Sequence, residues 1–455
     1  MTNIKTLSVL LLLALSATAV SARDYRLDER AEVDLSGVEE ITFDLRGISC
    51  ALCVRTIDIP SILRGDGRTS TLDLSLAGEI RSNRAKAVPS LVVDESGRRV
   101  VIRFYEDRKS FFALNQGGTA EFEAVFPESY RGSITVTGTS HDVTARDFDL
   151  GDFVMSSSSG DMTVESVRAA SMELEVSSGD FRASALASAG SLSIDSSSGR
   201  IDADRLEAAR IDVKAGSGDI TVGAVEAEDT AAFEASSGDV RVDRMRAGSI
   251  MVDTSSGGIT LGEAIADDEL TATASSGRIE GDRLVARRMR LDTSSGRITV
   301  GEVESGTGRI EVSSGDVDLG ALRADDVEMK LSSGDLEIGE LEIAALRVDT
   351  SGDARIASGR GGIVLDGSSG KVDISLDELT GGIGIDVSSG DVTLHLPRES
   401  AFDARLKASS GRIESEFPII GDVSSDRDDV AGSVNGGGSM VEIETSSGDI
   451  RLEIR

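Results

Sequence analysis

Two cysteines and two histidines are the scarcest chemically versatile residues in this sequence. Cys50 and Cys53 are the only cysteines. In an exported protein, two cysteines this close together are typical of a structural disulfide that tightens a loop. A thioredoxin-type redox site would need a βαβ context that the sequence lacks. A metal site is a further alternative, although only His141 and His395 could add imidazole ligands. The remaining alternative is that both cysteines are free thiols.

In all copies of a repeated Ser-Gly turn but the one at Gly257-Gly258, a charged residue follows the turn glycine, and in most copies it is an aspartate. If the copies stack, these residues lie about 4.8 Å apart, where like charges repel by about 1 kcal/mol in water. The run Asp316, Asp335 and Asp353 could bind Ca²⁺, which takes carboxylate oxygens as ligands. The alternative is a solvated charge ladder, partly neutralised by basic residues such as Arg297 in the same series. The nonapeptide signature of calcium-binding β-rolls is absent, which favours the ladder.

Enzymatic activity needs a constellation of groups, and the sequence offers none. Polysaccharide-cleaving β-helices commonly use clustered aspartates with a histidine, but Asp267-Asp268 and Asp428-Asp429 have no histidine nearby. We expect His141 and His395 at the surface or in a cap. The many serines are better explained as turn formers than as nucleophiles, since no base recurs beside them. We therefore predict a protein that is not an enzyme and that holds no cofactor.

The turns that carry these residues repeat with a regular period. Thirteen glycines follow one another at a mean spacing of about 19 residues, and two later copies extend the series towards the C-terminus. They are Gly160, Gly179, Gly199, Gly218, Gly238, Gly257, Gly277, Gly296, Gly315, Gly334, Gly352, Gly370 and Gly390, then Gly411 and Gly448. We expect each glycine to form a corner with positive φ, which costs glycine no Cβ clash.

Apolar residues alternate with polar ones on both sides of each glycine. Around Gly334 they are Val327, Met329 and Leu331 before it, and Leu336 and Ile338 after it. A period of two is the strand signal, so each repeat is two short strands joined at the turn. One repeat cannot bury its own apolar face, whereas stacked repeats form a continuous core. The sequence thus predicts an all-β fold, a single-chain parallel β-solenoid of about 13 to 15 coils.

The chain divides into three parts. Residues 1–22 resemble a signal peptide, with Lys5 before an apolar run and Val20-Ser21-Ala22 as the cleavage site. Eleven of the fifteen Phe and Tyr residues lie between Tyr25 and Phe153. We therefore expect residues 23–150 to form a β-rich cap that covers the first coil. The solenoid takes residues 151–455, with residues 412–455 irregular, including a flexible Asn435–Gly438, before a regular closing coil.

The net charge of −33 narrows the class of partner. An acidic surface repels nucleic acid and anionic membranes. Because the apolar run in residues 1–22 is too short for a membrane span, we expect an exported mature chain without one, periplasmic or at the cell surface.

Several sequence segments resemble one bacterial family of β-strand-repeat proteins. The segments are Val125-Phe126-Pro127, Leu394-His395-Leu396-Pro397, Ala408-Ser409-Ser410-Gly411-Arg412-Ile413 and Thr445-Ser446-Ser447-Gly448-Asp449-Ile450. The family is known as the "putative adhesins", a domain of unknown function, and its pattern covers about residues 120–455. The resemblance implies an adhesin or envelope-binding rod that presents its repeated faces to a protein or polymer. The alternatives are a periplasmic structural protein without a dedicated ligand and a polysaccharide-active β-helix enzyme.

Overall fold

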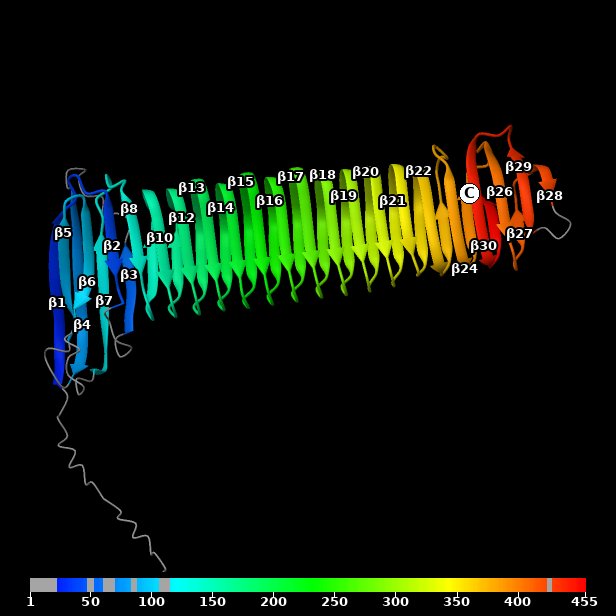
Figure 1. The fold of residues 1–455 in the computed structure, drawn as a ribbon. Coiled ribbons are helices and arrows are strands. Elements are labelled where there is room, and N and C mark those ends of the chain that lie inside the picture. The colour runs from blue at the N-terminus through cyan, green and yellow to red at the C-terminus, as the bar shows by residue number, and fades with distance from the viewer. Residues whose placement is uncertain (1–22, 47–52, 60–69, 83–87, 106–114, 424–427) are drawn as a thin grey trace, which may run out of the picture.

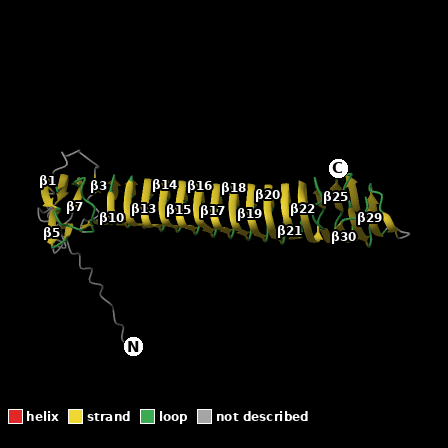
Figure 2. Ribbon diagram, turned by 90° about the horizontal axis from the view of Figure 1, so that it is seen from above, coloured by secondary structure: helices red, strands yellow, loops and turns green. Residues whose placement is uncertain are grey.

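The protein is a straight rod made of strands (Figures 1 and 2). The structure, a computed structural model, describes residues 23–46, 53–59, 70–82, 88–105, 115–423 and 428–455. It confirms the all-β parallel solenoid of about 14 turns with a period of about 19 residues. The predicted signal peptide, residues 1–22, lies outside the described residues, as does Cys50. Among the described residues, no helix is long and apolar enough to cross a membrane.

The middle of the rod consists of long strands that each turn one corner of the coil. Every strand pairs in parallel with the one before it and the one after it, and apolar positions face inward. These strands are β12 (Val167–Val176), β13 (Phe181–Ser196), β14 (Ile201–Ala215), β15 (Ile220–Ala235), β16 (Val240–Thr254), β17 (Ile259–Ala274), β18 (Ile279–Thr293), β19 (Ile298–Val312), β20 (Val317–Leu331), β21 (Leu336–Thr350) and β22 (Ala354–Ser369). Register shifts in many of these pairs mark the corner.

The turn glycines pack on one another along the rod. A Cβ added at Gly277 would lie 1.8 Å from the carbonyl oxygen of Gly257, and all fifteen predicted turn glycines show such an approach to backbone oxygen, at 1.7–2.3 Å. The predicted positive φ is wrong for most of them. It occurs at Gly315, Gly334, Gly370, Gly390 and Gly448. Glycine is needed at these fifteen corners because a Cβ would overlap the backbone of the neighbouring coil.

Parallel stacking extends into the N-terminal region. Two walls of the rod continue through β8 (Ser133–Thr137) and β9 (Asp142–Arg146) onto β2 (Glu40–Asp44) and β3 (Cys53–Ile59). Antiparallel pairs then close each wall. The strands of these pairs are β1 (Arg23–Asp34), β4 (Thr71–Ser82), β5 (Ser90–Ser96), β6 (Arg99–Tyr105) and β7 (Asn115–Val125). Between these strands and the middle coils lie β10 (Asp149–Ser157) and β11 (Met162–Glu165).

The core changes character along the rod. Near the N-terminus it is aromatic, where the rings of Phe43 and Phe104 lie edge-on to Phe122 at centroid distances of 6.2 and 5.0 Å. In the middle coils the inward residues are mainly Ile, Val, Leu, Met and Ala. The aromatic residues thus mark a β-rich N-terminal region, and the predicted boundary near residue 150 stays a prediction because parallel stacking continues across it.

The C-terminal end does not follow the order of the chain. The coil formed by β24 (Ile383–Ser389) and β25 (Val392–Leu396) is followed in space by β30 (Ser439–Ser447) and β31 (Ile450–Ile454). The earlier segments β26 (Phe402–Ala408) and β27 (Ile413–Ser415) stack beyond them. Antiparallel strands β29 (Asp429–Val434) and β28 (Ile420–Val423) then end the sheet, while β23 (Val372–Ser375) precedes β25. The last coil of the sequence is therefore not the last coil of the rod.

Candidate functional site

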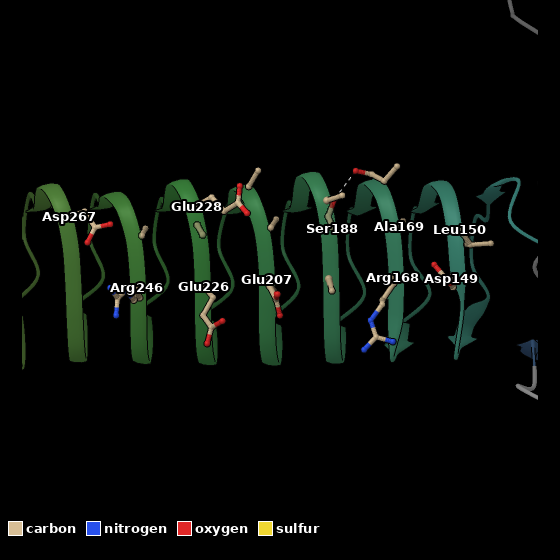
Figure 3. Close-up of a pocket in the computed structure, with 17 residues that line it drawn as sticks. Asp149, Leu150, Arg168, Ala169, Ser188, Glu207, Glu226, Glu228, Arg246 and Asp267 are labelled. Atoms are coloured by element: carbon tan, nitrogen blue, oxygen red, sulfur yellow. Dashed lines mark hydrogen bonds between the residues drawn. The ribbon is translucent and has the colours of Figure 1, made fainter.

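A groove runs along one corner of the rod across several successive coils, from β10 to β17. It has a volume of about 840 Å³. Figure 3 shows its labelled side chains rising from neighbouring strands along the axis. A groove in this direction would hold an extended chain that lies across the strands, along the axis of the rod.

Small residues form the floor of the groove. Ala169, Ser188, Ala208 and Ala227 occupy the same register position on four consecutive strands, and Ala247 continues the row. The parallel register shifts directly after this position. The small side chains and the bend of the backbone leave the surface recessed at this position.

Ser188 is the polar residue of this floor, and it is buried. Its Oγ lies 3.0 Å from the carbonyl oxygen of Ala170 and 2.9 Å from that of Ser191, and it accepts the N–H of Gly190. The hydroxyl thus satisfies the backbone at the bend. These bonds give Ser188 a structural role at the bend.

The groove carries more acidic than basic groups. Its carboxylates are Asp149, Glu207, Glu226, Glu228 and Asp267, and its guanidinium groups are Arg168 and Arg246. Arg205, outside the groove, binds both Glu207 and Glu226, at 3.3 and 3.1 Å. The excess of carboxylates makes this surface attractive to a partner that carries positive charge.

The aspartate row has a structural role. Asp316 Oδ1 accepts the N–H of Asp335 at 3.1 Å, and Asp335 Oδ1 accepts that of Asp353 at 2.9 Å. The N–H of Asp335 is the main cause that lowers the pKa of Asp316. Each carboxylate therefore binds the turn of the next coil. In the described part of the chain, no three His, Cys, Asp or Glu residues are arranged to hold a metal ion, and calcium binding by these aspartates stays a prediction.

The two histidines lie at opposite ends of the rod. His141 is 2% exposed, neither ring nitrogen has a hydrogen-bond partner among the described residues, and burial lowers its pKa. A Cβ on Gly160 would lie 1.8 Å from the His141 carbonyl oxygen, so His141 occupies the turn position one coil earlier. It is therefore not at the surface. The repeat count missed this coil because histidine replaces glycine in Ser140-His141-Asp142.

His395 lies on β25, between two carboxylates. Its Nε2 is 3.3 Å from Asp373 Oδ1, and its Nδ1 is 3.4 Å from Glu453 Oε2. The three residues come from three successive coils of the rod, in the spatial order of β23, β25 and β31.

The remaining candidates that the structure describes lie in different parts of the rod. Asp267 lines the groove, whereas Asp268 pairs with Arg288 at 2.8 Å. Cys50 is outside the described residues, so the predicted disulfide with Cys53 cannot be placed. The groove residues were missed because sequence reasoning followed the inward alternation. The recurring alanine nine residues after the turn glycine, as in Ala208 and Ala247, was the available signal.

Comparison with known proteins gives one family and one distant structure. The family model Toastrack DUF4097 matches residues 68–263, 243–344 and 302–453. The crystal structure of a "putative cell adhesion protein" from Clostridium sporogenes shares 9% identity, covers 95% of this chain and 100% of its own, and has a TM-score of 0.16. A score this low supports no argument about fold or function. No curated protein matches the chain.

Proposed function

Because the chain belongs to the Toastrack DUF4097 family, a domain of unknown function, we propose its role from the surface of the rod. It is an exported, non-enzymatic binding rod that holds a protein or an envelope polymer along its length. The groove from β10 to β17 is the observation that carries this proposal.

The shape of the groove favours an extended partner. Its floor of alanines admits a chain close to the backbone of the rod, and its direction lets one partner contact many coils at once. Repeated contacts of this kind raise avidity even when each is weak. Few aromatic residues are available in the solenoid for stacking on neutral sugars, and the net charge of −33 disfavours nucleic acid.

A groove-filling variant tests the binding role. Ala189→Trp with Ala209→Trp would fill the groove, and Ala232→Trp, on an outward position of β15 outside the groove, is the matched control. Isolated cell envelopes are incubated with purified protein, and the bound fraction is measured by sedimentation. We expect the groove variant to bind at least about tenfold more weakly. Equal binding by all three proteins would contradict the proposal.

Treatment of intact cells with protease tests where the rod acts. Loss of the chain, followed with an antibody, would support a surface adhesin. Protection until the periplasm is opened would favour the alternative, a periplasmic structural protein without a dedicated ligand.

A further inference from the structure

The C-terminal coil, β30 and β31, fills a slot between two other coils instead of ending the stack. β30 pairs in parallel with β24 on one side and β26 on the other, and β31 pairs likewise with β25 and β27. Its inward residues are fully or almost fully buried, and they are Val441, Ile443, Thr445, Ile450 and Leu452. Without this coil, the rod would carry an apolar slot with a strand edge on each of its two walls.

Both walls of the slot match the coil that fills it. At one wall, the Val392 N–H donates to the carbonyl oxygen of Asp449 at 2.9 Å. At the other wall, Glu442 forms an ion pair with Arg405 at 3.3 Å. These contacts lie outside the segment that leads into the coil, so β30 and β31 of a second copy would make all of them in the same register.

A short hinge, residues 435–438, directs the coil into the slot of its own rod. β29 runs antiparallel to β26 and β30 runs parallel to it, so the chain reverses its direction at the hinge and crosses β26. The reversal uses positive φ at Asn435, Gly436 and Gly437, with values of 48, 94 and 81°. A residue that favours a negative, extended φ would straighten the hinge, and β30 would then continue away from its own rod.

We propose that the C-terminal coil is exchangeable between two copies of this chain, so that two rods join at this end. The slot of each copy then holds β30 and β31 of the other, with the same pairing and burial, and only the hinge changes its conformation. A short tether gives the chain's own coil an effective concentration on the order of 1 mM. Single rods therefore prevail at micromolar concentration, and opening of the hinge shifts the chain to joined pairs.

A hinge variant of the full chain, Gly436→Val with Gly437→Val, tests the exchange. Valine disfavours positive φ, and a Cβ at Gly437 would lie 2.7 Å from Asp403 Oδ1. Gly37→Val with Gly97→Val is the matched control, because both glycines have positive φ and open space around a Cβ. At about 10 μM, far below the effective concentration of the tether, light scattering should give twice the chain mass for the hinge variant and the single mass for the control. A monomeric hinge variant or a dimeric control would overturn the proposal.

Disulfide trapping identifies the surfaces that join the copies. Arg405 on β26 and Glu442 on β30 lie opposite each other in register. Chains with Arg405→Cys and chains with Glu442→Cys are made separately, each with Cys50→Ser and Cys53→Ser, and are then mixed, refolded from urea and oxidised. A disulfide between the two kinds of chain shows that the coil of one fills the slot of the other. In the control mixture, Met251→Cys, at a 50% exposed position of β16, replaces Glu442→Cys.

The yield of this mixed disulfide distinguishes exchange from other association. With the hinge variant in both chains at about 10 μM, we expect a yield at least about tenfold higher than with the natural hinge. A dimer whose yield equals that of the Met251→Cys control would overturn the proposal. Should the hinge variant aggregate, the natural hinge decides at about 1 mM, near the effective concentration of the tether. There the Arg405→Cys and Glu442→Cys mixture should exceed the control, and an equal yield would overturn the exchange.

Discussion

The middle coils and the C-terminal end use the same turn but differ in the order in which the chain fills the stack. Strands β13 to β21 stack strictly in sequence. At the C-terminus, Gly448 packs on Gly390, and Gly411 packs on Gly448. The same contact therefore joins residues 19 apart in one region and 58 apart in another. The turn glycine allows any two coils to pack closely, whereas the connecting segments determine which coils are neighbours.

The connection that sets the order is Asn435–Gly438. Its preceding strand, β29, and its following strand, β30, lie on opposite sides of β26. Asn435 Nδ2 donates to the carbonyl oxygens of Arg398 and Ser400 at 3.0 and 2.8 Å. A Cβ on Gly438 would lie 2.6 Å from the carbonyl oxygen of Ala401. This glycine-rich segment, expected to be flexible, crosses closely over the start of β26 with defined contacts.

Removing the C-terminal coil should have the largest effect. A chain that ends at residue 438 loses β30 and β31 and opens a gap with an unpaired strand edge on each side, so we expect aggregation. Deletion of residues 278–296 removes one middle coil and rejoins Gly277 to Arg297, which preserves the turn. That chain should stay soluble and monomeric. Size-exclusion chromatography with light scattering compares the two, and equal behaviour would show that chain order at the end is unimportant.

A second comparison uses two buried phenylalanines. Phe402 and Phe233 are both fully buried, but among the described rings only Phe402 of the two packs edge-to-face against another ring, that of Phe417, at a centroid distance of 5.5 Å. Substitution by alanine should cost about 3–5 kcal/mol at either site. We expect Phe402→Ala to cost about 1 kcal/mol more because it also breaks the aromatic pair. Urea unfolding monitored by circular dichroism measures both, and a larger loss for Phe233→Ala would refute this difference between the regions.

Substitution of two adjacent glycines in one middle turn tests whether the close approach of the coils explains the glycine row. A Cβ at Gly257 would lie 1.9 Å from the carbonyl oxygen of Gly238, whereas the nearest atom to one at Gly258 is 3.5 Å away. Gly257→Ala should lower the free energy of unfolding by about 2–3 kcal/mol through overpacking. Gly258→Ala should be nearly neutral. If thermal melting shows equal shifts for both variants, coil spacing does not explain the glycine row.

The smallest expected loss of stability comes from replacing aspartates of the row. It also tests whether the bond between neighbouring turns depends on the order in which the chain fills the stack. Asp316 accepts the N–H of Asp335 in sequential coils, and Asp391 accepts that of Asp449 where the order is broken. Replacement of Asp316 or Asp391 by alanine should cost about 1 kcal/mol near neutral pH, a low value because the carboxylates are partly exposed. Thermal melting at pH 7 should show similar losses for the two variants, whereas unequal losses would tie the bond to chain order.

The same pair predicts a pH dependence. The accepted N–H group is the main cause that lowers the pKa of each carboxyl group below 3.8 in the folded state. The stabilisation is therefore present above pH 3.8 and is lost as the pH falls through the lower folded value. The difference between the natural chain and each alanine variant should shrink in melting experiments below pH 3.8. A difference that persists at lower pH would argue against the hydrogen bond.

The parallel β-solenoid could be predicted from the sequence because every coil carries the same two local signals, the alternation of apolar and polar residues and the turn glycine. Gly277 was correctly placed at a corner, although its packing against Gly257, not its φ, explains the residue. The coil at His141 was hidden by a single substitution in the turn. The floor of the groove could have been found from the alanine that recurs nine residues after the turn glycine, as in Ala208 and Ala247. The position of the C-terminal coil was not predictable, since stacking order depends on contacts between distant segments.

The interleaved C-terminal coil also has a mechanical consequence. In a stack filled in sequence, a force on the last residue would peel the end coil away by breaking one ladder of hydrogen bonds at a time. Here β30 is bonded to β24 and to β26, so the same force must rupture two ladders together. The segment formed by β30 and β31 is thereby anchored inside the rod, and a pull on it does not act on an outer coil.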